Sequence, residues 1–174
     1  TLRAINNMTI VEPADNFETA EVIKQDISYN HPLYIRYGKK PMMDIHPPGT
    51  EFIIGKSIVV KKGEDLTIVA TGETLQRAYL ASEILKESNI HCSIISMHTI
   101  KPFDKKTFIE FSKNSKAILT VEEHSIFGGL GECCASLIAQ NNINVKLKIL
   151  GIPDEYIINV SQADVLDHYD MSPE

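Results

Sequence analysis

The chain has 174 residues, of which 43% are hydrophobic, and carries a formal net charge of −6 at pH 7. This length suits one ordinary domain, or one domain with a piece of another, and the hydrophobic fraction is enough for a packed core. The negative charge argues against a nucleic-acid surface, which needs a basic patch to neutralise phosphates. No apolar run approaches the roughly 20 residues that span a bilayer, so neither nucleic acid nor membrane is an expected partner.

The first residues, up to about 38, predict one strand–helix–strand unit. A β-prone run at 8–11 is stopped by Pro13, and Asp15 with Glu18 three residues later resembles a helix capping box. Helical spacing then relates four apolar residues: Phe17, Ala20, Ile23 and Ile27. A second strand is predicted over 33–37.

The next stretch, 38–56, has little periodicity and holds several prolines and glycines: Pro41, Pro47, Pro48, Gly49 and Gly55. Proline removes a backbone donor and fixes φ, so this stretch is not expected inside a sheet. We interpret it as an extended linker between two domains.

After the linker the pattern becomes regular. Strands are predicted at 66–70, 92–97, 117–121 and 145–149, the last as a half-exposed edge strand. Helices are predicted at 75–85, after the cap Asp104, at 130–139, and after the cap Ser161. Strands alternating with helices predict an α/β fold, a three-layer αβα domain with a mostly parallel sheet.

Polar side chains follow the strand at 117–121, where an open α/β sheet places its functional loops. Glu122, Glu123 and His124 emerge together, and Gly128 and Gly129 then allow a tight turn into a helix. The turn could cradle a phosphate, because a helix N-terminus exposes unpaired amides. No GxGxxG motif or Walker lysine is present, so a tight turn that packs helix on sheet is the preferred interpretation.

Other polar residues leave their roles open. Glu122, Glu123 and His124 could serve acid–base chemistry, but no nucleophile lies beside them in sequence, which favours a polar interface cluster. His98 and Lys101 are expected to be structural anchors. Four histidines at apparent turns or surfaces show no ligand spacing: His31, His46, His91 and His168.

The cysteines and the start of the chain suggest its compartment. Cys92, Cys133 and Cys134 form neither a CxxC motif nor an even disulfide framework, so reduced thiols in a cytoplasmic protein are favoured over a metal site. The chain start lacks the basic segment and apolar block of a signal peptide. Because its first residue is Thr1, we expect a processed or truncated chain.

Arg36 stands at the end of the second predicted strand. An arginine there is usually solvated or salt-bridged, but its planar fork can also bind a phosphate through two hydrogen bonds. Spacing alone leaves these alternatives open.

Nearly the whole chain resembles the transketolase family, especially its split C-terminal subunits. The segments that carry the resemblance lie at 2–9, 13–15, 18–19, 55–56, 63–72, 99–104 and 122–131. The resemblance implies that residues 1–40 end a pyrimidine-binding domain, that 41–57 form a linker, and that 58–174 form the transketolase C-terminal domain. Asn6 departs from the family, in which proline is usual at this position.

The resemblance also implies an activity: transfer of a two-carbon ketol unit between sugar phosphates, with thiamine diphosphate and a divalent metal. The domains that bind this cofactor would lie outside the chain, so the chain alone is expected to bind neither and to contribute no catalytic residue. Arg36 matches a residue that contacts substrate phosphate. Glu122, Glu123, His124, Gly128 and Gly129 would lie at an interface or at the active-site entrance.

Partners follow from the same resemblance. They would be the remaining transketolase domains or an N-terminal subunit, a second copy in a homodimer, and a sugar phosphate, within the pentose phosphate pathway. Two alternatives stay open. One is a related thiamine-diphosphate enzyme, either deoxyxylulose phosphate synthase or the β chain of a 2-oxoacid dehydrogenase. The other is a non-catalytic assembly module.

Overall fold

The computed structural model of the chain describes residues 2–38 and 42–174. Its first part contains a short 3-10 helix, one α-helix and three strands: η1 (Leu2–Ala4), β1 (Thr9–Val11), α1 (Asn16–Asp26), β2 (Leu33–Ile35) and β3 (Ile58–Lys61). Its second part alternates strands and helices: β4 (Leu66–Ala70), α2 (Thr74–Glu87), β5 (Cys92–Ser96), β6 (Thr99–Lys101), α3 (Lys105–Asn114), β7 (Ala117–Ser125), α4 (Leu130–Gln140), β8 (Lys146–Ile152) and α5 (Gln162–His168).

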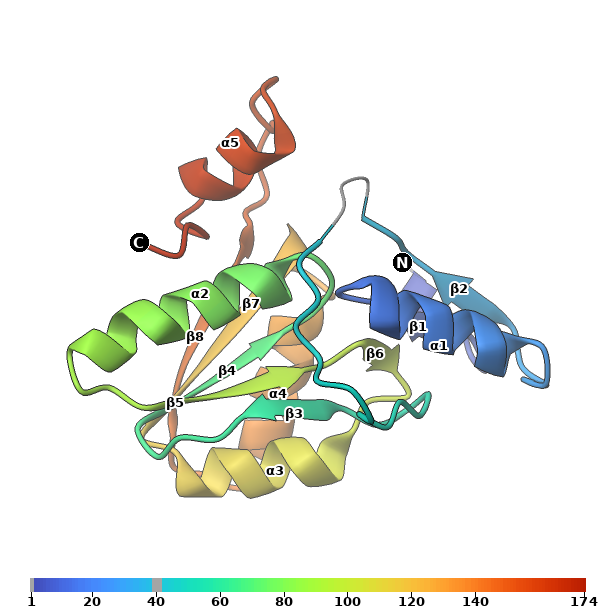
Figure 1. Ribbon diagram of the computed structural model, residues 1–174, viewed down its shortest axis with the longest axis horizontal. Coiled ribbons are helices and arrows are strands. Elements are labelled where there is room, and N and C mark those ends of the chain that lie inside the picture. The colour runs from blue at the N-terminus through green and yellow to red at the C-terminus, as the bar shows by residue number, and fades with distance from the viewer. Residues whose placement is uncertain (1, 39–41) are drawn as a thin grey trace.

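A five-stranded sheet in the order β3-β5-β4-β7-β8 forms the centre of the molecule. β3 runs antiparallel to β5, and the other neighbouring pairs are parallel. Helix α2 covers one face, and α3 and α4 cover the other (Figure 1). The predicted three-layer α/β fold with a mostly parallel sheet is therefore confirmed.

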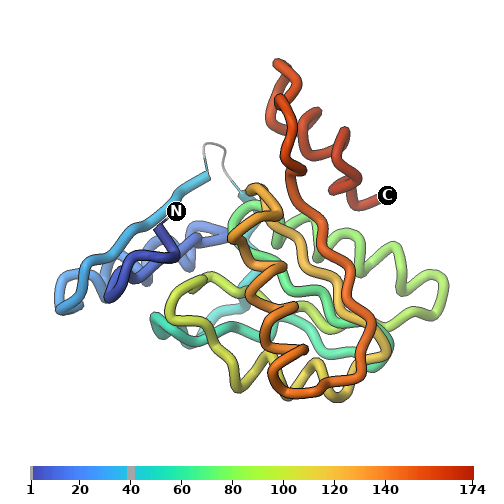
Figure 2. Tube along the Cα trace, turned by 180° about the vertical axis from the view of Figure 1, so that it is seen from behind, coloured from blue at the N-terminus to red at the C-terminus, as the bar shows by residue number. Residues whose placement is uncertain are grey.

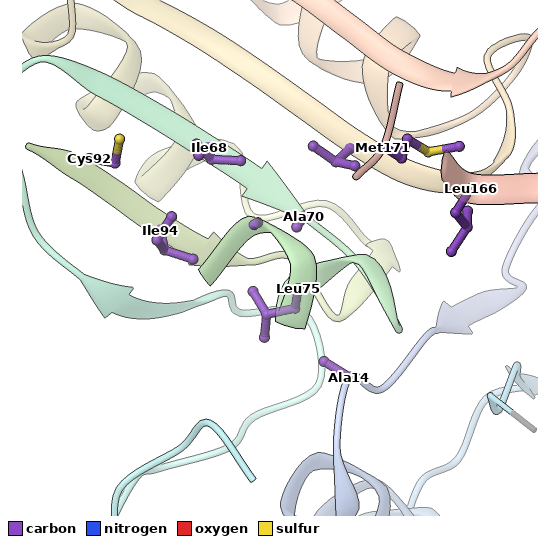
Figure 3. Packing of buried hydrophobic residues seen from close by; sticks show 10 residues of the cluster. Ala14, Ile68, Ala70, Leu75, Cys92, Ile94, Leu166 and Met171 are labelled. Atoms are coloured by element: carbon purple, nitrogen blue, oxygen red, sulfur yellow. The ribbon is translucent and has the colours of Figure 1, made fainter. Parts of the chain in front are cut away.

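The core under α2 joins distant parts of the chain. Leu75 of α2 packs with Ile68 and Ile94 of the sheet, and Leu166 of α5 belongs to the same buried cluster (Figure 3). Ala14, from the first part of the chain, is also a member. Burial of these side chains fixes α5 and the start of α1 onto the domain, since each large buried apolar side chain contributes roughly 1.5–3 kcal/mol.

Strands β1 and β2 join β6 in a second, three-stranded sheet in the order β2-β1-β6. β1 is parallel to β2 and antiparallel to β6, which comes from the second part of the chain. Figure 2 shows this blue part of the trace lying beside the larger sheet. The two parts thus share a sheet as well as a core.

Helix caps follow the sequence closely. Asp15 accepts a hydrogen bond from the Glu18 amide, Asp104 from the Thr107 amide, and Ser161 from the Asp164 amide. Each of the three predicted caps is confirmed. The capping box is incomplete, because the Glu18 carboxylate accepts from the Ala14 amide, 2.7 Å away, rather than from the Asp15 amide.

Several elements differ from the prediction. β3 and β6 were not predicted, and β7 extends to Ser125. In α1 the buried residues are Glu18 and Val22, whereas Ile23 and Ile27 are 49% and 87% exposed, so the apolar spacing does not identify the buried face.

The predicted division into domains remains a prediction. The described residues 42–57 contain no helix or strand, and Thr1 and 39–41 lie outside the described residues.

Candidate functional site

Three charged side chains from separate strands meet where the two sheets adjoin. Arg36 directly follows β2, Glu12 directly follows β1, and Glu123 lies in the last part of β7. Arg36 Nη1 forms ion pairs with both carboxylates, which are 9% and 6% exposed, while the arginine side chain is 34% exposed. Of the two alternatives for Arg36, the structure shows a salt-bridged residue that still reaches solvent.

Further hydrogen bonds hold the two carboxylates. Thr71 Oγ1 donates to Glu12 Oε2 at 3.2 Å, and Gln162 Nε2 donates to Glu123 Oε2 at 2.6 Å. Gln162 also donates to Glu73 Oε2 at 3.0 Å, so the first residue of α5 ties two acidic side chains together. We call Glu12, Arg36, Glu73, Glu123 and Gln162 the Arg36 cluster.

Electrostatics in the Arg36 cluster favour a charged guanidinium. Burial lowers the pKa of Arg36, but Glu12 and Glu123 outweigh this and raise it above its ordinary value. Burial also raises the pKa of Glu123; Arg36 opposes the rise, and Glu73 and Glu12 add to it. Two carboxylates pair with Arg36 and Glu73 borders the same cavity, so an anion that approaches the guanidinium meets both attraction and repulsion.

Glu122 has a different role from its neighbour. It is 2% exposed, and its carboxylate accepts hydrogen bonds from the amides of Leu130 and Gly131, at 2.8 and 2.9 Å. These amides are the unpaired donors that would hold a phosphate at the start of α4. The chain's own carboxylate occupies them, which agrees with the tight-turn interpretation.

The glycines explain how the turn comes so close to Glu122. A Cβ atom at Gly129 would overlap Glu122 Oε2, so only glycine leaves room for the carboxylate. Gly128 has a φ of +73°, a left-handed conformation that glycine adopts without strain. Its amide donates to Glu132 Oε2 at 2.7 Å.

The remaining predicted site residues lie apart from one another. His124 is exposed, and its ring nitrogen lies 3.4 Å from the Ser125 carbonyl. Lys101 donates to the carbonyls of Arg3 and Ile5 at 2.9 and 2.5 Å, and so anchors the start of the chain. His98 is fully buried and stacks on Phe52, with ring centroids 4.1 Å apart. Both residues are structural anchors, as expected.

Cavities open on two sides of Arg36. One, of about 310 Å³, also borders Arg3, Glu122 and His124. Another, of about 520 Å³, borders Glu73, Glu123 and Gln162. Arg36 borders both cavities, and Arg3 is a second cation at the first, so a ligand in either cavity could meet the Arg36 guanidinium.

One buried ionic cluster was not predicted from the sequence. His46, expected at a turn or surface, has a side chain with no exposed area, paired with the equally buried Asp15 and Glu18. Nothing in the local sequence shows this, because Asp15 and His46 are 31 residues apart.

The structure bears on two kinds of site that the sequence raised, a metal site and a phosphate site at the start of α4. Residues 2–38 and 42–174 contain no group of three or more His, Cys, Asp or Glu side chains that could hold a metal ion. The start of α4 is occupied by Glu122. Within the same residues, no helix has the length and apolar character needed to cross a membrane.

Comparison with known proteins gives consistent results. The family model described as the transketolase C-terminal domain matches residues 55–174. The chain is 36% identical over 174 residues to a subunit of the apulose-4-phosphate transketolase of Phocaeicola vulgatus, covering 99% of this chain and 55% of that protein. It is 39% identical over 175 residues to a putative transketolase C-terminal section of Methanocaldococcus jannaschii, covering 99% and 54%.

A solved structure, described as a split gene transketolase, inactive beta4 tetramer, is also similar. It superposes with a TM-score of 0.92 and 28% identity, covering 99% of this chain and 56% of that one. The chain thus spans about half the length of the relatives that it matches.

Proposed function

We propose that this chain, which belongs to the transketolase family, supplies the C-terminal portion of a thiamine-diphosphate enzyme that transfers a two-carbon ketol unit between sugar phosphates. The similarity to a transketolase subunit and to a transketolase C-terminal section supports this proposal. Thiamine diphosphate and its divalent metal would be held by domains other than those described here. The chain alone would be inactive.

The placement of Arg36 is the observation that carries the proposal. It is a permanently charged, half-buried cation at the ends of parallel strands, where open α/β sheets bind ligands. Its planar fork suits a phosphate, and Glu12 and Glu123 hold it in place before a ligand arrives. Because these carboxylates repel an anion, a substrate phosphate would have to draw the guanidinium away from at least one of them.

The turn from Glu122 to Gly129 would serve assembly. Glu122 and Gly129 fix the start of α4, which leaves Glu123, His124 and Gly128 along the rim of the cavities beside Arg36. We assign this rim to the active-site entrance and to contacts with the remaining domains or an N-terminal subunit. Self-association, as a homodimer or larger, is part of the proposal, and the tetrameric description of the similar structure supports it.

Reconstitution tests the proposed activity. The chain is combined with the missing domains, thiamine diphosphate and Mg²⁺, and ketol transfer from xylulose 5-phosphate is measured. Transfer supports the proposal. Turnover with pyruvate as donor, and none with xylulose 5-phosphate, would favour the synthase or dehydrogenase alternative. A stable complex without turnover on either donor would favour the assembly module.

A further inference from the structure

A buried ionic cluster lies where residues 42–57, here called the crossing segment, pass the start of α1. His46 of this segment has Nδ1 2.6 Å from Asp15 Oδ2 and Nε2 3.1 Å from Glu18 Oε1. The second contact is an ion pair without the alignment of a hydrogen bond. None of the three side chains has exposed area. Because an ionised carboxylate only accepts, each ring nitrogen must carry a proton to be attracted to it. The geometry therefore favours the imidazolium form.

The two carboxylates are also held by other donors. Asp15 accepts from the amides of Glu18 and Ile45, at 2.9 and 3.1 Å. Glu18 accepts from the Ala14 amide at 2.7 Å and from Ser96 Oγ at 2.6 Å. The cluster thus connects α1, the crossing segment and β5 in one network. Without the imidazolium, two negative charges would remain buried side by side, which is strongly unfavourable.

The network continues to the Arg36 cluster through the short loop between β1 and α1. Glu12 begins this loop and Asp15 ends it. The Glu12 amide donates to the His98 carbonyl at 2.7 Å, and the Glu12 carbonyl accepts from the Gly72 amide at 3.1 Å. The far end of the loop depends on Asp15 and on the Ala14 amide held by Glu18. We propose that His46 is a charged latch that fastens the crossing segment to α1 and so positions Glu12 and its ion-pair partner Arg36.

Other titratable groups around His46 favour the same charge state. His98 lies on the β5 side; burial lowers its pKa to about 4, so it stays neutral near pH 7. Asp44, beside Asn16 at the surface, and Glu73, which borders the same cavity as Asp15, add only negative charge nearby. Asp104 influences His98 and is also acidic. The one aromatic ring in stacking range of His46 among the described residues is Phe17, with centroids 5.3 Å apart.

The latch has a definite pH range. Burial lowers the pKa of His46, but the hydrogen bond to Asp15 and the close contacts with the Asp15 and Glu18 carboxylates outweigh this and raise it to about 9. A group whose folded pKa is raised stabilises the fold fully below its unfolded value, near 6.5, and loses that contribution as pH rises through about 9. The ion pairs of His46 with Asp15 and Glu18 are therefore present near neutral pH and are lost in alkali.

NMR of the full chain, uniformly labelled with carbon-13 and nitrogen-15, tests the latch between pH 6 and 10.5. We expect both ring nitrogens of His46 to be protonated at pH 7.5 and to titrate with a midpoint near 9. The Arg36 side-chain Nε signal, detected through Cζ because its proton exchanges fast in alkali, should shift over the same range. A neutral His46 ring at pH 7.5 would overturn the proposal, and this outcome can be read from the unaltered chain even if variants fail to fold.

A variant tests the positioning role. In His46→Gln, the Ile45 and Glu18 amides that bind Asp15 should lose at least about tenfold of their hydrogen-exchange protection at pH 7.5. The alkaline shift of the Arg36 signal should disappear. His168→Gln, at an exposed position of α5, is the matched control and should change neither. If the Arg36 signal keeps its pH dependence in His46→Gln, His46 does not position Arg36. None of these measurements involves turnover, so they are independent of the proposed ketol transfer.

Discussion

Glu122 caps α4 by accepting a hydrogen bond of 2.8 Å from the backbone amide of Leu130. Its other carboxylate oxygen accepts from the Gly131 amide. A side chain on a strand thus supplies the cap that a residue just before the helix usually provides. Gly129, the residue just before α4, has no side chain to cap the helix, so the start of α4 depends on Glu122 of β7.

Glu122→Ala should lower the free energy of unfolding by about 2 kcal/mol, because two buried amides lose their acceptor. Urea denaturation measures this change. The control is Glu132→Ala, whose carboxylate accepts from the Gly128 amide at an exposed position, and it should cost about 0.5 kcal/mol or less. Equal costs for the two variants would show that Glu122 is not the main cap.

Gly129→Ala should destabilise the chain by about 2 kcal/mol or more, since the new methyl group would overlap the pinned Glu122 carboxylate. The same substitution in a Glu122→Ala background should cost clearly less, because the overlapping group is gone. A double-mutant cycle by urea denaturation measures the difference. Strict additivity would mean that Gly129 is not needed to make room for the Glu122 carboxylate.

The buried His98 predicts a loss of stability in weak acid. Burial lowers its folded pKa to about 4 from an ordinary 6.5, so only the unfolded chain binds this proton as pH falls between these values. At 1.36 kcal/mol for each pKa unit, this residue accounts for about 3 kcal/mol lost between pH 6.5 and 4. Between pH 6.5 and 4, the free energy of unfolding should fall markedly less for His98→Gln than for the unaltered chain, as urea denaturation at each pH would measure. His31→Gln, at an exposed position, should leave the slope unchanged.

Arg36→Ala, made in the complete enzyme, should raise the KM for phosphorylated sugars about tenfold or more, because a charge-assisted contact to phosphate is lost. Arg36→Lys should recover only part of the loss, since lysine keeps the charge but not the planar fork. Steady-state kinetics with phosphorylated and unphosphorylated substrates separate this effect from misfolding. Unchanged KM and kcat would reject the phosphate role.

Local signals in the sequence were enough for most of the larger sheet and the helices that cover it. The apolar strands β4, β5 and β7 and the capped helix α3 are specified by nearby residues, and each was predicted. β3 and β6, with four and three residues, were missed, whereas β1 and β2, with three residues each, were predicted, so short apolar runs do not separate strand from loop by periodicity alone. Their pairing depends on contacts with strands far away in the chain.

The candidate site was harder to predict for the same reason. Arg36 and the Glu122–Gly129 turn could be selected from residue type and position, but their partners could not. Glu123 is 87 residues from Arg36, and Asp15 is 31 from His46. A buried histidine between two carboxylates has the same local sequence as one at a surface turn, so only the packed chain distinguishes them.

β8 ends the larger sheet and has β7 as its neighbour. An edge strand offers a row of unpaired backbone groups to which another chain can add, the usual first step in aggregation. Lys146 and Lys148 are exposed along this strand and alternate with the half-buried Leu147 and Ile149. A second copy that approached edge to edge would bring like charges together. The two lysines therefore disfavour edge-to-edge strand addition at β8 of the folded chain.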